Sequence, residues 1–170
     1  KKGNTFQLDL NNDHGDQKRV NFPHREIYEY LTPNTILLVN DGRIRLQIIE
    51  QKKDSLTTEI LNDGIISNNK GVNIPDIILP IDSLTSKDRS DLMKALEMNV
   101  DWIALSFVQQ VEDIMRLKEI VKNKALIMAK IEKPSAVKNI DQIINIADGV
   151  MIARGDLGVE MPPERVPIVQ

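Results

Sequence analysis

Two stretches late in this 170-residue sequence place charged side chains at the ends of apolar runs. Residues 126–132 read Leu-Ile-Met-Ala-Lys-Ile-Glu, and residues 149–156 read Gly-Val-Met-Ile-Ala-Arg-Gly-Asp. Parallel strands covered on both faces are almost wholly apolar, so an ionisable side chain there is paired, metal-bound or at a strand end. Proteins with α/β folds build active sites at the carboxyl ends of such strands. The two runs therefore predict neighbouring parallel strands whose ends carry a site.

Lys130, Glu132 and Asp156 are the side chains that could do chemistry at this site. Residues two apart on a strand share a face, so Lys130 and Glu132 point together with Met128. Asp156 follows the next strand, which lies about 4.8 Å away in a parallel sheet. Two carboxylates that leave positions for water and substrate oxygens suit Mg²⁺ or Mn²⁺. Gly155 lets the backbone approach a ligand and offer amides to an anion, so the set suits an anionic substrate whose reaction builds negative charge on oxygen.

Each motif alone has a plainer interpretation. A single Lys-x-Glu pair is more often a structural ion pair, and Arg154-Gly155-Asp156 could be an exposed turn. We favour the metal site because both motifs end consecutive parallel strands, which makes their charges converge.

The composition is that of an ordinary globular protein, with 41% hydrophobic and 28% charged residues. Lys and Arg total 22 against 25 Asp and Glu, and this near balance argues against nucleic acid as the main partner. The absence of cysteine excludes disulfides and zinc-thiolate sites and fits a reducing compartment. No apolar run approaches the roughly 18 residues that span a bilayer, and the first residues given lack the pattern of a secretory signal. We expect a cytoplasmic protein without a membrane partner.

The first part of the chain, residues 1–73, reads as a small all-β domain. Alternating apolar and polar residues and turn signals such as Asn40-Asp41-Gly42 predict a small barrel or sandwich, with a short helix within 23–30. The expected strands are 6–10, 18–22, 35–39, 43–50 and 55–61. Segment 73–80 contains two prolines and suits a linker between domains.

The second part, residues 74–170, alternates helix and strand patterns. Strands are expected at 100–108, 126–131 and 149–153, and helices from 85, at 112–122, at 137–146 and after Pro163. This order implies about three parallel strands with right-handed crossovers. Three strands cannot close an eight-stranded barrel, so the chain looks like a piece of a larger protein.

These residues resemble the pyruvate kinase family. Residues 128–132 and 149–160 are similar to the two most characteristic segments of that family, and the resemblance runs from Asn34 onward. Further matches, in the family's order and spacing, are 39–42, 70–75, 79–80, 87–88, 91–92 and 104–108. The resemblance implies a β-rich lid domain, residues 1–73, inserted into a (β/α)8 TIM barrel of which residues 74–170 are the middle part.

The resemblance also implies an activity, which is transfer of a phosphoryl group from phosphoenolpyruvate to ADP in glycolysis, giving pyruvate and ATP. It implies Mg²⁺ or Mn²⁺, K⁺ with ligands outside this chain, and a homotetrameric parent protein.

On the same resemblance, Lys130 stabilises charge on the transferring phosphoryl group and the enolate oxygen. Glu132 and Asp156 match the Mg²⁺ ligands, and the amides of Gly155 and Asp156 match contacts to the pyruvate carboxylate. Lys70 matches a nucleotide-contacting lysine of the lid. The minor candidates are Asp41 as a lid acid that faces the site on closure, Ser106 as a wall residue, and Arg154.

Some positions depart from the family. Lys133 stands where the family most often has Asn, and Ser135-Ala136 where it often has Glu-Gly. We expect these changes to adjust the rim of the site and to leave the metal ligands untouched. The barrel strands that would supply a phosphate-binding arginine and a substrate-contacting threonine lie outside residues 1–170, so we expect the isolated chain to be inactive.

Two alternatives remain open at this point. One is another Mg²⁺-dependent barrel enzyme that handles an enolate, which would need neither the lid nor Lys70. The other is a non-catalytic β module and partial barrel that associates through an open sheet edge.

Overall fold

The computed structural model of this chain describes residues 1–75, 77–78 and 84–170. Its contacts divide the chain into two compact units, Lys1–Ile81 and Asp82–Gln170. The predicted domain boundary lies between residues 73 and 74. In the structure, Ile74 is 3% exposed and packs in the core of the first unit. The proposed linker at 73–80 includes residues 76 and 79–80, which lie outside the described residues.

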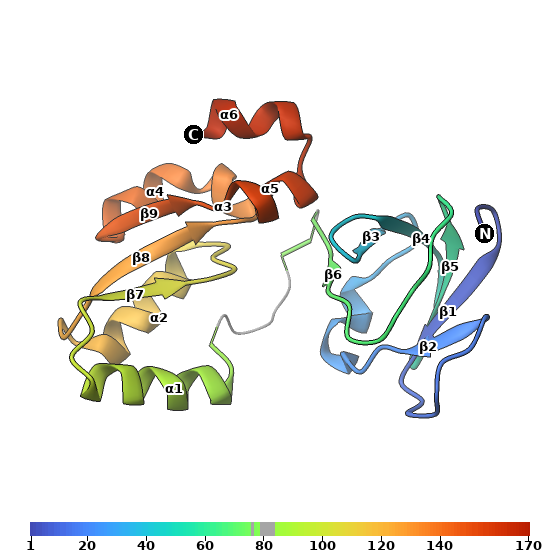
Figure 1. The fold of residues 1–170 in the computed structure, drawn as a ribbon, viewed down its shortest axis with the longest axis horizontal. Coiled ribbons are helices and arrows are strands. Elements are labelled where there is room, and N and C mark those ends of the chain that lie inside the picture. The colour runs from blue at the N-terminus through green and yellow to red at the C-terminus, as the bar shows by residue number, and fades with distance from the viewer. Residues whose placement is uncertain (76, 79–83) are drawn as a thin grey trace. The chain divides into compact units, whose positions relative to one another are not determined.

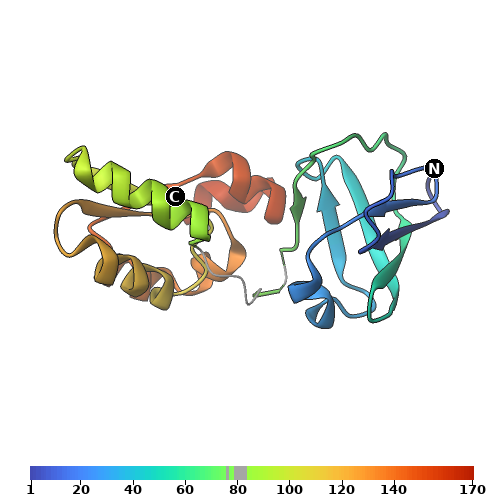
Figure 2. The ribbon, with the colours of Figure 1, turned by 90° about the horizontal axis from the view of Figure 1, so that it is seen from below.

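The first unit is a curled six-stranded sheet in the order β2-β1-β5-β4-β3-β6 (Figures 1 and 2). Only β1 and β2 pair in parallel, and the other neighbouring strands are antiparallel. A buried core of aliphatic and aromatic side chains fills the curl. The elements are β1 (Thr5–Asp9), β2 (Arg19–Asn21), the 3-10 helix η1 (Arg25–Tyr30), β3 (Ile36–Val39), β4 (Ile44–Gln51), β5 (Ser55–Ile60) and β6 (Val72–Asn73). The barrel-like β domain expected from the sequence is confirmed.

The turn between β3 and β4 is formed by Asn40-Asp41-Gly42, the turn signal identified in the sequence. Asp41 and Gly42 have φ values of 56° and 77°, and the Arg43 amide donates to the Asn40 carbonyl over 3.2 Å. Two successive residues with positive φ match the right-handed twist of a hairpin, and Asp-Gly accepts that conformation at little cost. The turn sets the register in which Val39 pairs with Ile44.

A buried ion pair fastens the loop between β1 and β2. The Arg19 guanidinium holds both carboxylate oxygens of Asp9 and also donates to the carbonyls of Asn11, Asp13 and His14. Asp9 is 6% exposed, so its charge needs this partner. The hydrogen bond from Arg19 is the main reason that the pKa of Asp9 lies below its ordinary value of 3.8.

This lowered pKa predicts a pH dependence for the stability of the first unit. Because Asp9 binds its proton less readily in the folded than in the unfolded chain, its stabilisation is fully present above pH 3.8 and is lost as the pH falls through the lower folded pKa. Urea unfolding between pH 2 and pH 6 measures it. We expect Asp9→Asn to lower the urea midpoint at pH 6 and to flatten its decline in acid. A decline as steep as that of the wild type would contradict this assignment.

The second unit contains a parallel three-stranded sheet in the order β7-β8-β9, with helices between the strands (Figure 1). Its buried core lies between the sheet and these helices. None of the helices in the described ranges has the length and hydrophobicity that crossing a bilayer requires. The elements are α1 (Ser86–Glu97), β7 (Trp102–Leu105), α2 (Val111–Val121), β8 (Leu126–Ile131), α3 (Pro134–Lys138), α4 (Ile140–Ile146), β9 (Gly149–Ile152), α5 (Arg154–Glu160), the 3-10 helix η2 (Pro163–Arg165) and α6 (Val166–Val169). The partial barrel expected from the sequence is confirmed.

Two helices differ from the sequence expectation. The single helix predicted over 137–146 is broken at Asn139, whose side-chain amide donates to the Gln109 carbonyl over 3.0 Å. The Asn139 backbone has φ −101° and ψ 16°, outside the usual α-helical range, and this ends α3 before α4 begins. Helix α5 was not predicted as an element, and it carries Arg154, Gly155 and Asp156.

Candidate active site

Strand β8 presents alternate side chains to opposite faces of the sheet, as the sequence predicted. Ile127, Ala129 and Ile131 are at most 2% exposed and pack against the helices. Met128 and Lys130 lie on the other face and are only half-buried. The strand therefore delivers the Lys130 side chain, and Glu132 directly after its last residue, to the face that the helices do not cover.

Lys130 and Glu132 form the centre of the site. The Lys130 ammonium lies 2.5 Å from Glu132 Oε1 and donates to Ser106 Oγ over 3.0 Å. The Glu132 side chain is 2% exposed and that of Lys130 is 24% exposed. Ser106 directly follows β7, so the ends of two neighbouring strands meet at one ammonium group. A cation held this way, with one side open to solvent, can approach an anionic ligand.

A backbone donor completes the surroundings of Glu132. The amide of Phe107 donates to Glu132 Oε2 over 2.8 Å. Phe107 has a φ of 55°, in the left-handed region that non-glycine residues rarely adopt. Such conformations persist where the surrounding structure requires them, often at functional sites. This residue was missed from the sequence, because neither a backbone amide nor its φ value leaves a pattern of side-chain types.

The structure also shows where the second predicted carboxylate lies. Asp156 is in the first turn of α5, and Asp156, Gly155 and Arg154 are all exposed. Leu157 is fully buried and anchors this helix. Within the described ranges, no hydrogen bond or ion pair joins Asp156 to Glu132. The structure thus brings Lys130, Glu132 and Ser106 into contact and leaves Asp156 exposed on a neighbouring element.

The donor set fits a hard divalent cation. An ionised carboxylate has about four lone-pair sites, and Glu132 uses one toward Lys130 and one toward Phe107. Mg²⁺ is typically bound by one or two carboxylates together with water and substrate oxygens. Among the described residues there is no group of three or more His, Cys, Asp or Glu side chains that could hold a metal ion. A divalent cation at Glu132 would therefore need water or substrate oxygens as further ligands, and Asp156 is the other carboxylate that the sequence predicted for this role.

The first unit brings two predicted lid residues to one edge. Asp41 occupies the turn between β3 and β4, and Lys70 directly precedes Gly71, whose carbonyl accepts from the Asn40 amide over 3.0 Å. Val39 then pairs with Val72. Both Asp41 and Lys70 are exposed. An acidic and a basic side chain, both exposed, therefore lie at the same edge of the sheet.

The expectation that Lys133 adjusts the rim of the site is wrong. Its ammonium forms a buried ion pair with Glu160 over 2.8 Å, and the two side chains are 9% and 2% exposed. Ala136 is fully buried, and Ser135 is half-buried in the first turn of α3. Lys133 and Ala136 are therefore buried positions and not part of an exposed rim.

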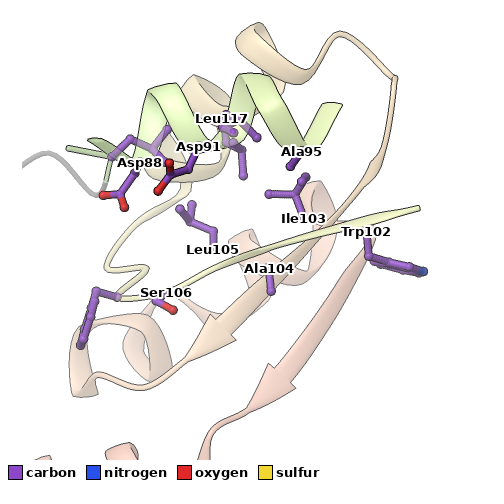
Figure 3. A pocket seen from close by; sticks show the side chains of 12 residues that line it. Asp88, Asp91, Ala95, Trp102, Ile103, Ala104, Leu105, Ser106 and Leu117 are labelled. Atoms are coloured by element: carbon purple, nitrogen blue, oxygen red, sulfur yellow. The ribbon is translucent and has the colours of Figure 1, made fainter. Parts of the chain in front are cut away.

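A groove of about 530 Å³ lies between α1 and β7 and reaches Ser106 and Phe107 (Figure 3). Most of the residues that line it are apolar, and Asp88 and Asp91 of α1 are its acidic residues. Asp88 already caps α1 through Thr85, and Asp91 pairs with Lys87. The groove therefore reaches Ser106, which bonds Lys130, and both acidic residues in its wall already have partners on or next to α1.

These features define part of a β/α-barrel protein that also contains a β-rich unit, with a lysine–carboxylate site at the strand ends of the barrel part. The family model described as pyruvate kinase, barrel domain, matches residues 1–170. The chain belongs to the pyruvate kinase family, as the sequence motifs indicated.

Individual relatives agree with the family match. The chain is 49% identical over 168 residues to a pyruvate kinase of Methylorubrum extorquens, covering 99% of this chain and 35% of that protein. It is 38% identical over 173 residues to a pyruvate kinase of Thermococcus litoralis, covering 100% of this chain and 36% of that protein. A crystal structure of a pyruvate kinase from Cryptosporidium parvum matches 99% of this chain and 37% of that chain, with a TM-score of 0.93 and 30% identity. The chain spans about a third of the length of these relatives.

Proposed function

We propose that this chain is the lid and the middle of the barrel of an enzyme that transfers a phosphoryl group from phosphoenolpyruvate to ADP. The carrying observation is the Lys130 ammonium held between Glu132 Oε1 and Ser106 Oγ at the carboxyl ends of adjacent strands. The family match supports this choice over another enolate-handling barrel enzyme. We also propose Mg²⁺ or Mn²⁺ as cofactor, K⁺ bound by residues outside this chain, and a homotetrameric whole protein.

Phosphoryl transfer depends on positioning and charge neutralisation more than on covalent help from the protein. Lys130 is the proposed catalytic residue, because its ammonium can contact the transferring phosphoryl group and the enolate oxygen that forms. Ser106 and Glu132 orient that ammonium. Glu132 and Asp156 would hold Mg²⁺, which when bound would withdraw charge from phosphoryl oxygens. The amides of Gly155 and Asp156 are proposed to bind the carboxylate of the substrate, beside Arg154.

The first unit is proposed to act as a lid over the nucleotide. Lys70 would contact the phosphates of ADP, and Asp41, at the same edge, would face the site on closure. Exclusion of water by a lid would prevent transfer of the phosphoryl group to water.

Replacing Lys70 tests the nucleotide role. We expect Lys70→Ala in the full-length protein to raise the KM for ADP about tenfold, the effect of losing one charge-assisted phosphate contact, and to leave the KM for phosphoenolpyruvate unchanged. Steady-state kinetics with each substrate varied in turn would measure this. Lys53→Ala, another exposed lysine of the first unit, is the matched control. An unchanged KM for ADP in Lys70→Ala would favour an enolate-handling enzyme without a nucleotide lid.

The isolated 170 residues are expected to be inactive in an assay of pyruvate formation in which the full-length protein turns over. They are also expected to self-associate. For the isolated 170 residues, this would agree with the alternative of a non-catalytic piece that associates through an open sheet edge. Trp102, Leu126 and Met151 are 43%, 46% and 42% exposed on strands β7, β8 and β9. Exposed apolar side chains grouped on one sheet promote association. Normal turnover by the isolated chain would refute the first expectation, and elution as a 19.3 kDa monomer would refute the second.

A further inference from the structure

The buried ion pair between Lys133 and Glu160 joins two elements that carry the proposed metal ligands. Lys133 directly follows Glu132 and is the N-cap residue of α3. Glu160 is the last residue of α5, the helix whose first turn contains Asp156. Their charged atoms are 2.8 Å apart, and neither side chain is more than 9% exposed. The contact therefore connects the end of β8 to the far end of the neighbouring helix.

The last residue of β8 and the second residue after it each bond one end of α5. The Ile131 carbonyl accepts from the amide of Ala153, just before α5, over 3.2 Å, and Lys133 holds the last residue of that helix. Glu132 lies between these two anchors in the chain. Asp156 lies between the same two anchors on α5. The two fastenings together determine where α5, and with it Asp156, lies relative to Glu132.

Helix α5 needs such fastening, because it has only seven residues and two of them are glycine. Helices this short are marginal by themselves, and glycine weakens them further. Leu157 is fully buried and anchors the middle of the helix, so the contacts at its two ends fix its direction. The Lys133–Glu160 ion pair is such a fastening, because breaking it by removing one partner would leave the other charge buried and unpaired.

We propose that Lys133 and Glu160 are positioning residues that set the separation of the Glu132 and Asp156 carboxylates and so the affinity of the site for a divalent cation. This inference rests on the proposed function, since it assumes that both carboxylates hold the same ion. It assigns no contact between Lys133 and the substrate. Loss of a group that orients a metal ligand typically costs 10- to 100-fold in metal affinity.

The test measures Mn²⁺ binding by electron paramagnetic resonance in the full-length protein, with the urea midpoint as a separate readout. We expect Lys133→Met to weaken Mn²⁺ binding about 10- to 100-fold and to change kcat at saturating Mn²⁺ much less. Lys118→Met is the matched control, because Lys118 pairs with Asp148, just before the start of β9 and at the opposite end of the strand from α5. Its Mn²⁺ affinity should equal that of the wild type.

A second variant covers the case in which Lys133→Met does not fold. Lys133→Met combined with Glu160→Met removes both charges, which is often tolerated in a buried site, so we expect recovery of the urea midpoint without recovery of Mn²⁺ affinity. Wild-type Mn²⁺ affinity in a folded variant that lacks the pair would overturn the inference. If Asp156→Asn lost Mn²⁺ in the same experiment, the proposed function would survive that result. If Asp156→Asn also bound Mn²⁺ normally, both the positioning role of Lys133 and Glu160 and the proposed metal site would be refuted.

Discussion

Lys130→Met in the full-length protein is expected to lower kcat by about three orders of magnitude, the scale seen when a preorganised charge-stabilising group is removed from a transition state. The ammonium is held by Glu132 and Ser106 and is the only group of this cluster that carries positive charge. Steady-state formation of pyruvate at saturating substrates measures the effect. In the proposed mechanism the ammonium interacts more strongly with the transition state than with the ground state, so kcat should fall much more than either KM rises.

The control for this substitution is Lys138→Met. Lys138 is an exposed lysine at the end of α3, so the same change of side chain there should leave kcat within twofold of the wild type. Glu132 loses its cation in Lys130→Met, so the urea midpoint should be recorded to show that the variant is folded. A folded Lys130→Met protein that retains most of its turnover would remove Lys130 from the mechanism.

Asp156→Asn is expected to weaken Mn²⁺ binding by more than 100-fold with little effect on folding. In the proposed site the substitution would replace one of two charged ligands by a neutral amide, and Mg²⁺ and Mn²⁺ both prefer carboxylate oxygen. Because Asp156 is exposed, the free energy of unfolding should change by less than about 0.5 kcal/mol. Titration of the full-length protein with Mn²⁺, followed by electron paramagnetic resonance, gives the affinity.

Asp141 provides a matched control for Asp156. It is also an exposed aspartate in the first turn of a short helix, α4, so Asp141→Asn makes the same chemical change in a similar helical position. Equal loss of Mn²⁺ affinity in both variants would mean that general surface charge, and not a ligand, was being measured.

The parts of the fold that were predictable have local causes. The alternation of Ile127, Ala129 and Ile131 with polar or exposed positions identified the helix-facing side of β8, and the Asp41-Gly42 turn fixed the hairpin. Both depend on residues close together in sequence. At the break at Asn139 the side chain bonds the Gln109 carbonyl, 30 residues away, and the local apolar pattern over 137–146 did not show this contact.

The same distinction applies to the site. Contact between Lys130 and Glu132 was predictable, because residues two apart on a strand share a face. The amide of Phe107 was not, because every residue but proline has one and only the fold selects which one faces Glu132. Burial of Lys133 was mistaken for exposure, since its partner Glu160 is 27 residues away and belongs to a helix that the sequence pattern did not predict.

The central claim is that Glu132 and Asp156 bind the same divalent cation beside Lys130. Anomalous diffraction from crystals of the full-length protein soaked in Mn²⁺ tests it most directly. We predict one strong anomalous peak within coordination distance of a carboxylate oxygen from each residue, with the Lys130 ammonium next to it. A fully occupied Mn²⁺ peak that contacts neither carboxylate, or only one of them, would contradict the claim.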